Sequence, residues 1–379
     1  MRVVVAGYVA GFPVAGLFWH AASFVLGFRA AGHDVWYLDD SGDEPWGWDV
    51  DAGDFDHECR YGSRFLTREM AALGLGDRWV FRHAPSGRFD GMDRDTTMDV
   101  LAEADVLVNV SLALTMRPEY VRIPHRLAID TDPVFTQIRI RRGYQHFAAI
   151  PENHTRLFTF GRPPLPAQAG EWVPCRQPVP ADAWPAVDPA GPGAPFTTVA
   201  SWHAYPGATW EGVRYGVKDE SLRRFADLPA GAPRPLAIAL SSGRRIREAT
   251  SLLAARGWRL VDPVSASRDT TSYRAFIAGS AGEIGLAKHG YVAARSGWFS
   301  ERSCSYLGAG RPVVAQDTGW SDWLPTGDGL FAFTTRAEAI AGLEAVASDP
   351  ERHCAAARKL AVEHFDAATV CTGLMEAAL

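Results

Sequence analysis

The sequence predicts an α/β protein of two domains, each built on a mainly parallel sheet. Apolar runs of strand length alternate with segments of helical periodicity along most of the 379 residues, which is typical of parallel sheets covered by helices. A proline-rich stretch without periodicity then divides the chain. We expect domains at 1–162 and 196–364, a linker at 163–195, and a final helix at 365–379.

The amino-terminal half opens with a strand, a glycine-containing loop at 7–16 and a helix. The glycine spacing in this loop is not that of a dinucleotide fingerprint. The acidic segment at 42–60 is expected to be an exposed excursion. Strands are predicted at 2–7, 33–38, 78–82, 105–110, 126–129 and 156–160, and helices at 17–31, 61–73, 95–104 and 134–147.

The carboxyl-terminal half repeats the alternation. Strands are predicted at 196–202, 210–217, 235–241, 258–261, 283–287, 311–315 and 330–333. Helices are predicted at 219–225, 245–256, 271–279, 299–307, 336–347, 350–364 and 367–378.

Composition argues against several classes of protein. A net charge of −6 provides no basic field, so nucleic acid is not an expected partner. Five cysteines show neither metal-ligand nor disulfide spacing, which fits a reduced cytoplasm. The chain starts directly with a strand, so we expect no signal peptide, and no apolar run has the length of a membrane span. Oligomeric state is not indicated.

The segment 282–320 reads as strand, polar loop, helix, strand and polar loop. In an open parallel sheet both loops would lie at the carboxyl edge, where ligands bind. Ser296 and Gly297 precede the helix, and free backbone N–H groups at such a position suit an anion such as phosphate. A plain helix cap explains Ser296 almost as well.

Residues 310–315 read Gly-Arg-Pro-Val-Val-Ala and follow a helix. This resembles the Gly-x-Pro-Val-Val-Ala motif of glycosyltransferases with the two-domain GT-B fold. Retaining members of that family carry two glutamates where this chain has Gly297 and Ser305. The resemblance implies two Rossmann-like domains facing across a cleft. It also implies a nucleotide-diphosphate sugar on the carboxyl half, an acceptor on the amino half, and a last helix that returns to the amino-terminal domain.

The resemblance also suggests donor-binding residues. Glu301 is the acidic residue of the helix and would accept the ribose hydroxyls, although a first-turn glutamate is also favoured by the helix dipole. Each of the other candidates has an ordinary structural explanation as a turn, a cap or a surface residue. They are Lys288 and His289 for base or phosphate, Arg295 with Ser296 and Gly297 for the diphosphate, and Asp317, Thr318 and Gly319 for the sugar.

Weaker candidates lie at the ends of two further strands. Small polar residues there could approach phosphate: Ser201, Trp202, Ser241, Ser242 and Gly243, followed by Arg244 and Arg245. Lys218 opens a helix, as the phosphate-binding lysine does in similar enzymes.

Two residues are candidates for the general base. Inverting GT-B enzymes often use a histidine near the position of His20, and a neutral imidazole can take the proton of an attacking hydroxyl. A packed helix histidine is the alternative. Asp132, with Asp130 nearby, is the competing base, although aspartate before proline is also ordinary turn chemistry. Phe12, Phe18 and Trp19 would offer an apolar acceptor surface.

The resulting hypothesis is a metal-independent glycosyltransferase without a cofactor. It would use a nucleotide-diphosphate sugar and a small-molecule or glycan acceptor. No metal ligands are predicted, because the Asp130–Asp132 pattern lies in the acceptor half. A sugar-nucleotide epimerase of the same layout and a non-catalytic GT-B-like partner protein remain alternatives. Sugar, base, acceptor and stereochemical outcome are not indicated.

Overall fold

The computed structural model describes residues 1–241 and 246–379. Its amino-terminal half contains, in chain order, β1 Arg2–Gly7, α1 Ala15–Ala30, β2 Asp34–Asp40, β3 Gly47–Asp49, β4 Asp54–Asp56, α2 Arg60–Ala72, β5 Trp79–His83, β6 Arg88–Gly91, α3 Arg94–Ala102, β7 Val106–Val110, α4 Pro118–Val121, β8 His125–Asp130, α5 Phe135–Arg141, α6 Ile150–Asn153, β9 Arg156–Thr159 and β10 Val173–Pro174. A sheet in the order β10-β9-β8-β7-β1-β2-β5-β6 organises this half, with β6 antiparallel to β5.

The second half begins after the proline-rich segment. It contains β11 Phe196–Ser201, β12 Ala208–Trp210, β13 Val213–Tyr215, α7 Lys218–Arg224, β14 Leu236–Ser241, α8 Ile246–Ala255, β15 Arg259–Val261, α9 Pro263–Ser267, α10 Thr270–Ala278, β16 Gly282–Gly285, α11 His289–Ala293, α12 Glu301–Gly308, β17 Val313–Gln316, β18 Leu330–Phe333, α13 Arg336–Ser348, α14 Pro350–Phe365 and α15 Ala367–Ala378. Its sheet is parallel in the order β15-β14-β11-β16-β17-β18. The predicted α/β class with two parallel sheets is confirmed.

Alternation along β1 explains how the first sheet is buried on both faces. Val3 and Val5 enter one apolar core, whereas Val4 and Ala6 enter the core on the opposite face. Successive side chains of a strand point to opposite faces, so a strand covered on both sides is apolar at every position. Strand β1 is therefore packed between two apolar layers, which fixes the position of the loop that follows its carboxyl end.

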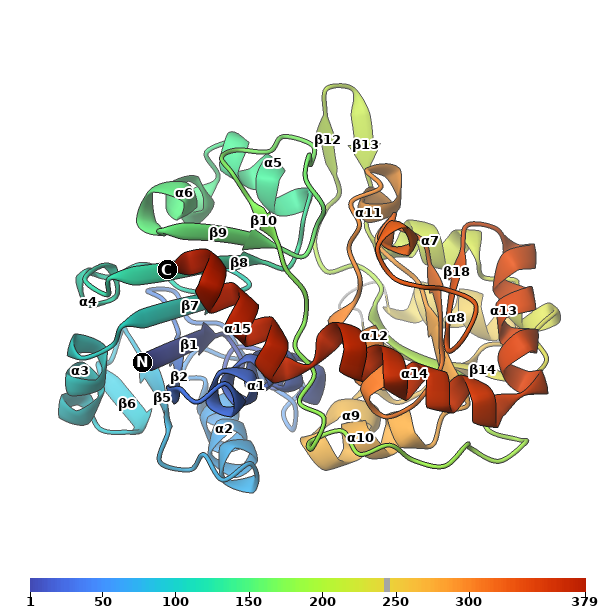
Figure 1. The fold of residues 1–379 in the computed structure, drawn as a ribbon, viewed down its shortest axis with the longest axis horizontal. Coiled ribbons are helices and arrows are strands. Elements are labelled where there is room, and N and C mark those ends of the chain that lie inside the picture. Colours follow the sequence, from blue (N-terminus) through green and yellow to red (C-terminus); the bar gives the residue numbers. More distant parts are fainter. Residues whose placement is uncertain (242–245) are drawn as a thin grey trace.

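The last helix lies on the amino-terminal domain (Figure 1). The Cys371 thiol of α15 is 3.8 Å from the Phe24 carbonyl of α1, and Arg156 Nε donates to the Ala377 carbonyl at 2.8 Å. Gly27 makes the close approach of the two helices possible. A Cβ there would lie 2.6 Å from the sulfur of Cys371 and 2.7 Å from the Ala367 oxygen. The two helices therefore pack almost backbone to backbone.

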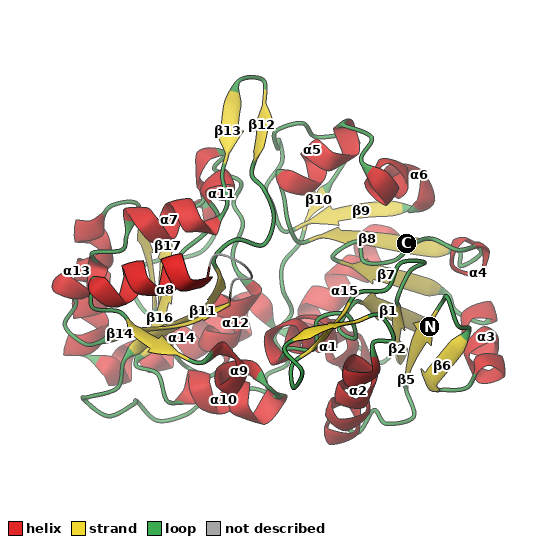
Figure 2. Cartoon of the chain, turned by 180° about the vertical axis from the view of Figure 1, so that it is seen from behind, coloured by secondary structure: helices red, strands yellow, loops and turns green. Residues whose placement is uncertain are grey.

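Two local predictions are wrong in detail. Residues 210–217 form no sheet strand; they belong to the antiparallel hairpin β12–β13, which projects beyond both sheets (Figures 1 and 2). The helix predicted at 134–147 ends at Arg141, because Gly143 has a φ of 66°. The excursion at 42–60 carries a second hairpin, β3–β4.

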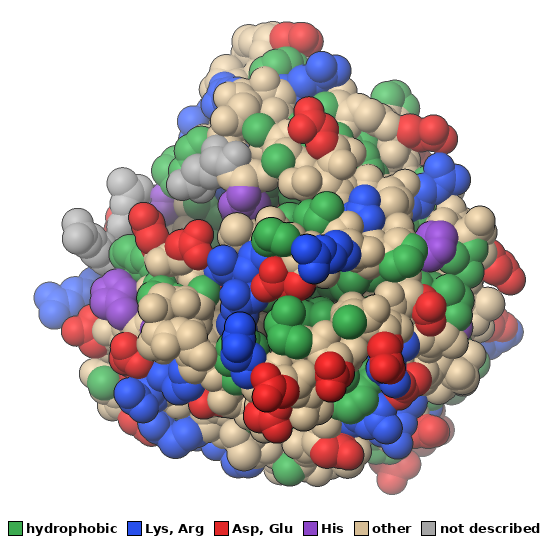
Figure 3. Space-filling view, turned by 90° about the vertical axis from the view of Figure 1, so that its left-hand side faces the viewer, with side chains coloured by type: hydrophobic (Ala, Val, Ile, Leu, Met, Phe, Trp, Pro, Cys, Tyr) green, Lys and Arg blue, Asp and Glu red, His purple; other side chains and the backbone are tan. Residues whose placement is uncertain are grey.

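The surface agrees with the absence of a basic field. The face drawn in Figure 3 mixes acidic and basic side chains, with hydrophobic ones between them. None of the helices within 1–241 and 246–379 combines the length and apolar character needed to cross a bilayer.

Candidate active site between the two domains

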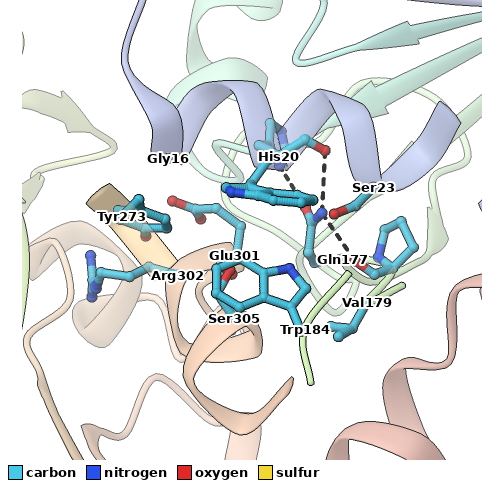
Figure 4. A pocket seen from close by; sticks show the side chains of 12 residues that line it. Gly16, His20, Ser23, Gln177, Val179, Trp184, Tyr273, Glu301, Arg302 and Ser305 are labelled. Atoms are coloured by element: carbon cyan, nitrogen blue, oxygen red, sulfur yellow. Dashed lines mark hydrogen bonds between the residues drawn. The ribbon is translucent and has the colours of Figure 1, made fainter. Parts of the chain in front are cut away.

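A cavity with about 310 Å³ of empty space, part of it open to solvent, lies where the two domains meet (Figure 4). Helix α1 contributes one wall, and α10, α12 and the linker contribute the others. The lining residues are Gly16, Trp19, His20, Ser23, Gln177, Pro178, Val179, Trp184, Tyr273, Glu301, Arg302 and Ser305. His20 and Glu301, predicted from opposite halves of the sequence, therefore line one cavity.

His20 is held by hydrogen bonds at both ring nitrogens. Its Nδ1 is 2.5 Å from Gln177 Oε1, and the amide nitrogen of Gln177 donates to the carbonyls of His20 and Pro178, each at 3.2 Å. The amide oxygen must therefore accept from Nδ1–H, which leaves Nε2 as the basic nitrogen. Nε2 is 3.1 Å from Ser111 Oγ, which in turn contacts Thr131 at 2.7 Å.

Burial sets the protonation state of this histidine. Desolvation lowers the pKa of His20, and the nearby Glu301 carboxylate and Gln177 only partly oppose it. The imidazole is consequently neutral near pH 7. A neutral ring, which carries a lone pair on Nε2, is the form that accepts a proton.

Glu301 reaches from the first turn of α12 towards α1 (Figure 4). Its carboxylate has one weak contact in the described chain, at 3.5 Å from Ser300 Oγ. Burial alone would raise the pKa of Glu301, but His20, Arg302 and Lys218 together lower it. The side chain is thus an ionised acceptor with both oxygens available.

Cationic groups gather beside Glu301. Arg302 Nε donates to the buried Glu283 at 2.5 Å, and its Nη1 donates to the Val199 carbonyl at 2.9 Å. Lys218 forms no hydrogen bond or ion pair with any residue in 1–241 or 246–379. Burial, followed by the repulsion of Arg302, lowers the pKa of Lys218 to about 7. Arg302 is thus already paired with a carboxylate, whereas Lys218 has no such partner in the described chain and is the cation left to meet an anionic ligand.

A second cavity, with about 230 Å³ of empty space partly open to solvent, lies at the carboxyl edge of β16 and β17. Arg302 lines both cavities. The residues around the second cavity are mostly apolar: Gly285, Leu286, Ala287, Trp298, Phe299, Ser300, Arg302, Ser303, Ala315, Gln316 and Trp320. Both cavities therefore adjoin the first turn of α12.

Asp132 belongs to a different cluster, which ties the domains together. Lys288 Nζ is 2.7 Å from its Oδ1, and the hydroxyls of Tyr205 and Tyr291 also donate to the carboxylate. Arg139 lies 3.8 Å away. Burial would raise the pKa of Asp132, but Lys288 and the two tyrosines hold it below its usual value. A carboxylate occupied in this way is a weak base and a strong interdomain link.

Backbone hydrogen bonds correct the predicted anion site at Ser296 and Gly297. The Ser296 N–H donates to the Tyr291 carbonyl at 3.0 Å, and the Gly297 N–H donates to the Thr318 carbonyl at 2.8 Å. Neither group is free for a phosphate. The helix cap is Ser300, whose Oγ accepts from Arg302 N–H at 3.2 Å. The reason is that α12 starts at Glu301, two residues later than predicted.

The other candidates on this half have structural partners. Asp317 accepts from the backbone of Gly319 and Ser321, and the buried Thr318 donates to the Trp298 carbonyl. Both therefore brace the turn itself. Arg295 forms a surface ion pair with Asp322 at 2.9 Å.

The ends of β11 and β14 contribute fewer side chains to the candidate site than predicted. Trp202 is wholly buried in the apolar core, so its side chain does not reach the cleft. Ser201 pairs in register with Ser241 at the end of the two strands. His289 starts α11 and accepts from the Gly216 N–H at 3.2 Å. Ser242, Gly243, Arg244 and Arg245 lie outside the described residues.

Phe18 and Trp19 were expected to face an acceptor, but both side chains are buried: Phe18 lies in the core of the amino-terminal domain, and Trp19 lies in the wall of the interdomain cavity. Conversely, three residues of the site were not predicted: Ser111, Gln177 and Arg302. Ser111 follows β7 with a φ of 59°, and a polar residue directly after a buried strand was the available signal. Gln177 lies within the proline-rich linker, where no periodicity marks a functional side chain.

Solved glycosyltransferase structures share this architecture over the whole chain. AviGT4, a glycosyltransferase involved in avilamycin A biosynthesis, is 12% identical with a TM-score of 0.55, covering 100% of this chain and 97% of its own. HepE from Anabaena, in complex with UDP and glucose, is 11% identical with a TM-score of 0.57, covering 100% and 99%. An α-glucosyltransferase in complex with UDP is 9% identical with a TM-score of 0.59, also covering 100% and 99%.

No protein-family model and no curated protein matches the sequence. The likeness therefore lies in the arrangement of the chain in space, and it extends over the full length of this chain. The chain has the two-domain GT-B fold of these glycosyltransferases.

Proposed function

We propose that this protein transfers a sugar from a nucleotide-diphosphate donor to an acceptor hydroxyl. The observation that carries the proposal is a single interdomain cavity in which the neutral His20 faces the ionised Glu301, beside the cations Lys218 and Arg302. A base on one domain and an anion site on the other are the two parts that such a transfer needs.

Each group has a role in the proposed reaction. His20 Nε2 accepts the proton of the acceptor hydroxyl as its oxygen bonds to the anomeric carbon. The bond from that carbon to the diphosphate breaks, and the leaving group takes the electron pair. Lys218 and Arg302 stabilise the diphosphate charge, so the step uses no metal. Glu301, with both oxygens available, accepts the ribose hydroxyls.

The neighbours suggest the first donors to test. HepE was solved with UDP and glucose, and the α-glucosyltransferase with UDP. We therefore place uridine diphosphate sugars first among the donors. The mostly apolar second cavity, at the edge of β16 and β17, is the proposed position of the base.

Titration calorimetry with UDP, ADP and GDP and their glucose conjugates tests the donor site. Lys218→Met should abolish binding of the preferred diphosphate. Lys359→Met is the matched control, because Lys359 lies on the surface of α14 and pairs with Glu363 at 3.6 Å. Equal binding by both variants would remove Lys218 from the site.

Product analysis separates the proposal from its alternatives. Incubation with donor and a panel of hydroxyl acceptors should release the nucleoside diphosphate with a new glycoside. Conversion of the donor sugar without an acceptor would instead show an epimerase. Binding without turnover under all conditions would show a non-catalytic partner protein.

A further inference from the structure

Four exposed aromatic side chains gather on the amino-terminal domain, next to the proposed active site. Tyr8 and Phe12 come from the loop between β1 and α1, and Trp46 and Phe55 come from the β3–β4 segment. They are 36%, 47%, 55% and 45% exposed, respectively. We call these four residues the aromatic strip. Apolar surface concentrated in this way on a protein usually marks a binding site.

Packing among the rings holds the aromatic strip in place. The rings of Trp46 and Phe55 meet edge to face at 5.1 Å, and those of Tyr8 and Phe12 at 6.2 Å. The Trp48 N–H donates to the Gly11 carbonyl at 2.9 Å, which joins the hairpin to the β1–α1 loop. The rings are therefore exposed in a fixed arrangement, before any ligand arrives.

Tyr8 connects the aromatic strip to the proposed base. Its side chain interacts with that of Ser111, the residue whose Oγ lies 3.1 Å from His20 Nε2. A molecule lying along the strip and over Tyr8 would bring its own edge to this serine. A hydroxyl at that edge could take the place of the serine hydroxyl at Nε2.

The segment that carries Trp46 and Phe55 is rich in acidic residues. Residues 43–58 include seven aspartates and glutamates and no lysine or arginine. Several of these carboxylates have partners; Asp43, for example, pairs with Arg117 at 2.9 Å. Glu44 and Asp54 are exposed and, within the described residues, pair with no basic side chain. Glu44 is two residues from Trp46, and Asp54 is next to Phe55.

We propose that the aromatic strip binds the acceptor and that the acceptor is an amine-bearing glycoside. The apolar face of its sugar ring lies on Trp46, and its protonated amine lies beside Glu44 and Asp54. Aromatic rings and carboxylates together favour an ammonium group over a neutral or acidic one. The proposal rests on the proposed function, because the strip leads to His20, and it names the acceptor class.

Binding without donor tests the aromatic strip by itself. We would titrate the protein with methyl β-glucosaminide, its N-acetyl derivative and methyl β-glucoside, and follow binding by saturation-transfer NMR. The amine should bind about five- to tenfold more tightly than the two neutral compounds, as one ammonium–aromatic contact and nearby carboxylates allow. Equal affinity for all three would overturn the proposal.

Variants then assign the effect to residues. Trp46→Ala should weaken binding of the amine about tenfold, and Tyr144→Ala, at another exposed aromatic, should not. The double change Glu44→Gln with Asp54→Asn should remove the preference for the amine, whereas Asp77→Asn should keep it. All five positions are exposed, so folding is not at risk. An unchanged preference in the double variant would also overturn the proposal.

The result is distinguishable from a failure of the proposed function. If UDP-sugars bind and transfer to neutral acceptors only, the function stands and this inference fails. If amine-bearing glycosides bind through Trp46 but no nucleotide binds, the strip is an amine-glycoside site and the glycosyltransferase proposal fails.

Discussion

The Nδ1 nitrogen of His20 lies 2.5 Å from the Oε1 oxygen of Gln177, although the two residues are 157 positions apart. His20 belongs to the first helix, whereas Gln177 belongs to the linker between the domains. The linker between the domains therefore also fixes which ring nitrogen of the candidate base carries the proton.

Replacing His20 tests the base. His20→Ala should lower kcat about 10²–10⁴-fold, the usual cost of losing a general base. Donor affinity, measured by calorimetry, should hardly change, because the cationic groups lie on the other domain. Asp132→Asn serves as the comparison and should retain more turnover, since this carboxylate links domains. Full turnover by His20→Ala with none by Asp132→Asn would make the aspartate the base.

Gln177→Glu should move the pH profile. Burial lowers the pKa of His20, so the wild-type acid limb of kcat/KM should lie below the ordinary histidine value of about 6.5. A carboxylate beside Nδ1 favours the charged imidazolium and raises this pKa. Because only the neutral ring accepts a proton, the limb should shift to higher pH. A profile that stays in place would show that His20 does not titrate in the reaction.

Lys218 should make donor binding dependent on pH. Its pKa of about 7 in the free protein means that it loses its proton as the pH rises through neutrality. Only the charged form attracts a diphosphate strongly, so affinity should fall between pH 6 and pH 8.5, with net proton uptake on binding above pH 7. Calorimetry in buffers of different ionisation enthalpy measures that uptake. Lys218→Met should abolish it, and Lys359→Met should not.

Glu301 can be tested with a modified nucleotide. If it holds the ribose, Glu301→Gln should weaken binding of the nucleoside diphosphate by about 2–4 kcal/mol, through the loss of two charge-assisted hydrogen bonds. The 2′-deoxy nucleotide should bind more weakly to the wild-type protein, but the variant should scarcely distinguish it from the parent compound. An equal effect of the deoxy substitution in both proteins would place the ribose elsewhere.

Two glycines provide a test of the docked last helix. Gly27→Ala should lower the melting temperature, because its Cβ would meet the sulfur of Cys371 at 2.6 Å and the Ala367 oxygen at 2.7 Å. Gly373 lies in α15 with open space around it. Gly373→Ala should therefore stabilise the protein by about 0.5–1 kcal/mol, the ordinary helix preference for alanine. Calorimetric scans of both variants should show shifts of opposite sign.

The fold could be predicted because its evidence is local. Strands such as β1 and β17 are continuous apolar runs, and a sheet covered on both faces requires that pattern. The motif at 310–315 supplied the remaining information on architecture. The prediction of a sheet strand at 210–217 was wrong, because an exposed hairpin and a sheet strand contain the same β-branched and aromatic residues.

The candidate site was only partly predictable, because it depends on contacts between distant segments. His20 and Glu301 could be selected by residue type and position, and the structure brings them together. The partners that decide their chemistry, Gln177 and Arg302, carry no local signature. The N–H groups of Ser296 and Gly297 looked free in sequence, but the Tyr291 and Thr318 carbonyls occupy them. Such occupancy cannot be read from a single segment.

The docking of α15 on α1 also has a consequence during synthesis of the chain. The Cys371–Phe24 contact joins residues 347 positions apart, so the surface of α1 around Gly27 stays uncovered until the last helix has left the ribosome. The amino-terminal domain, although made first, completes its packing last. Protease sensitivity of nascent chains should therefore persist in the first domain until α15 has emerged from the ribosome.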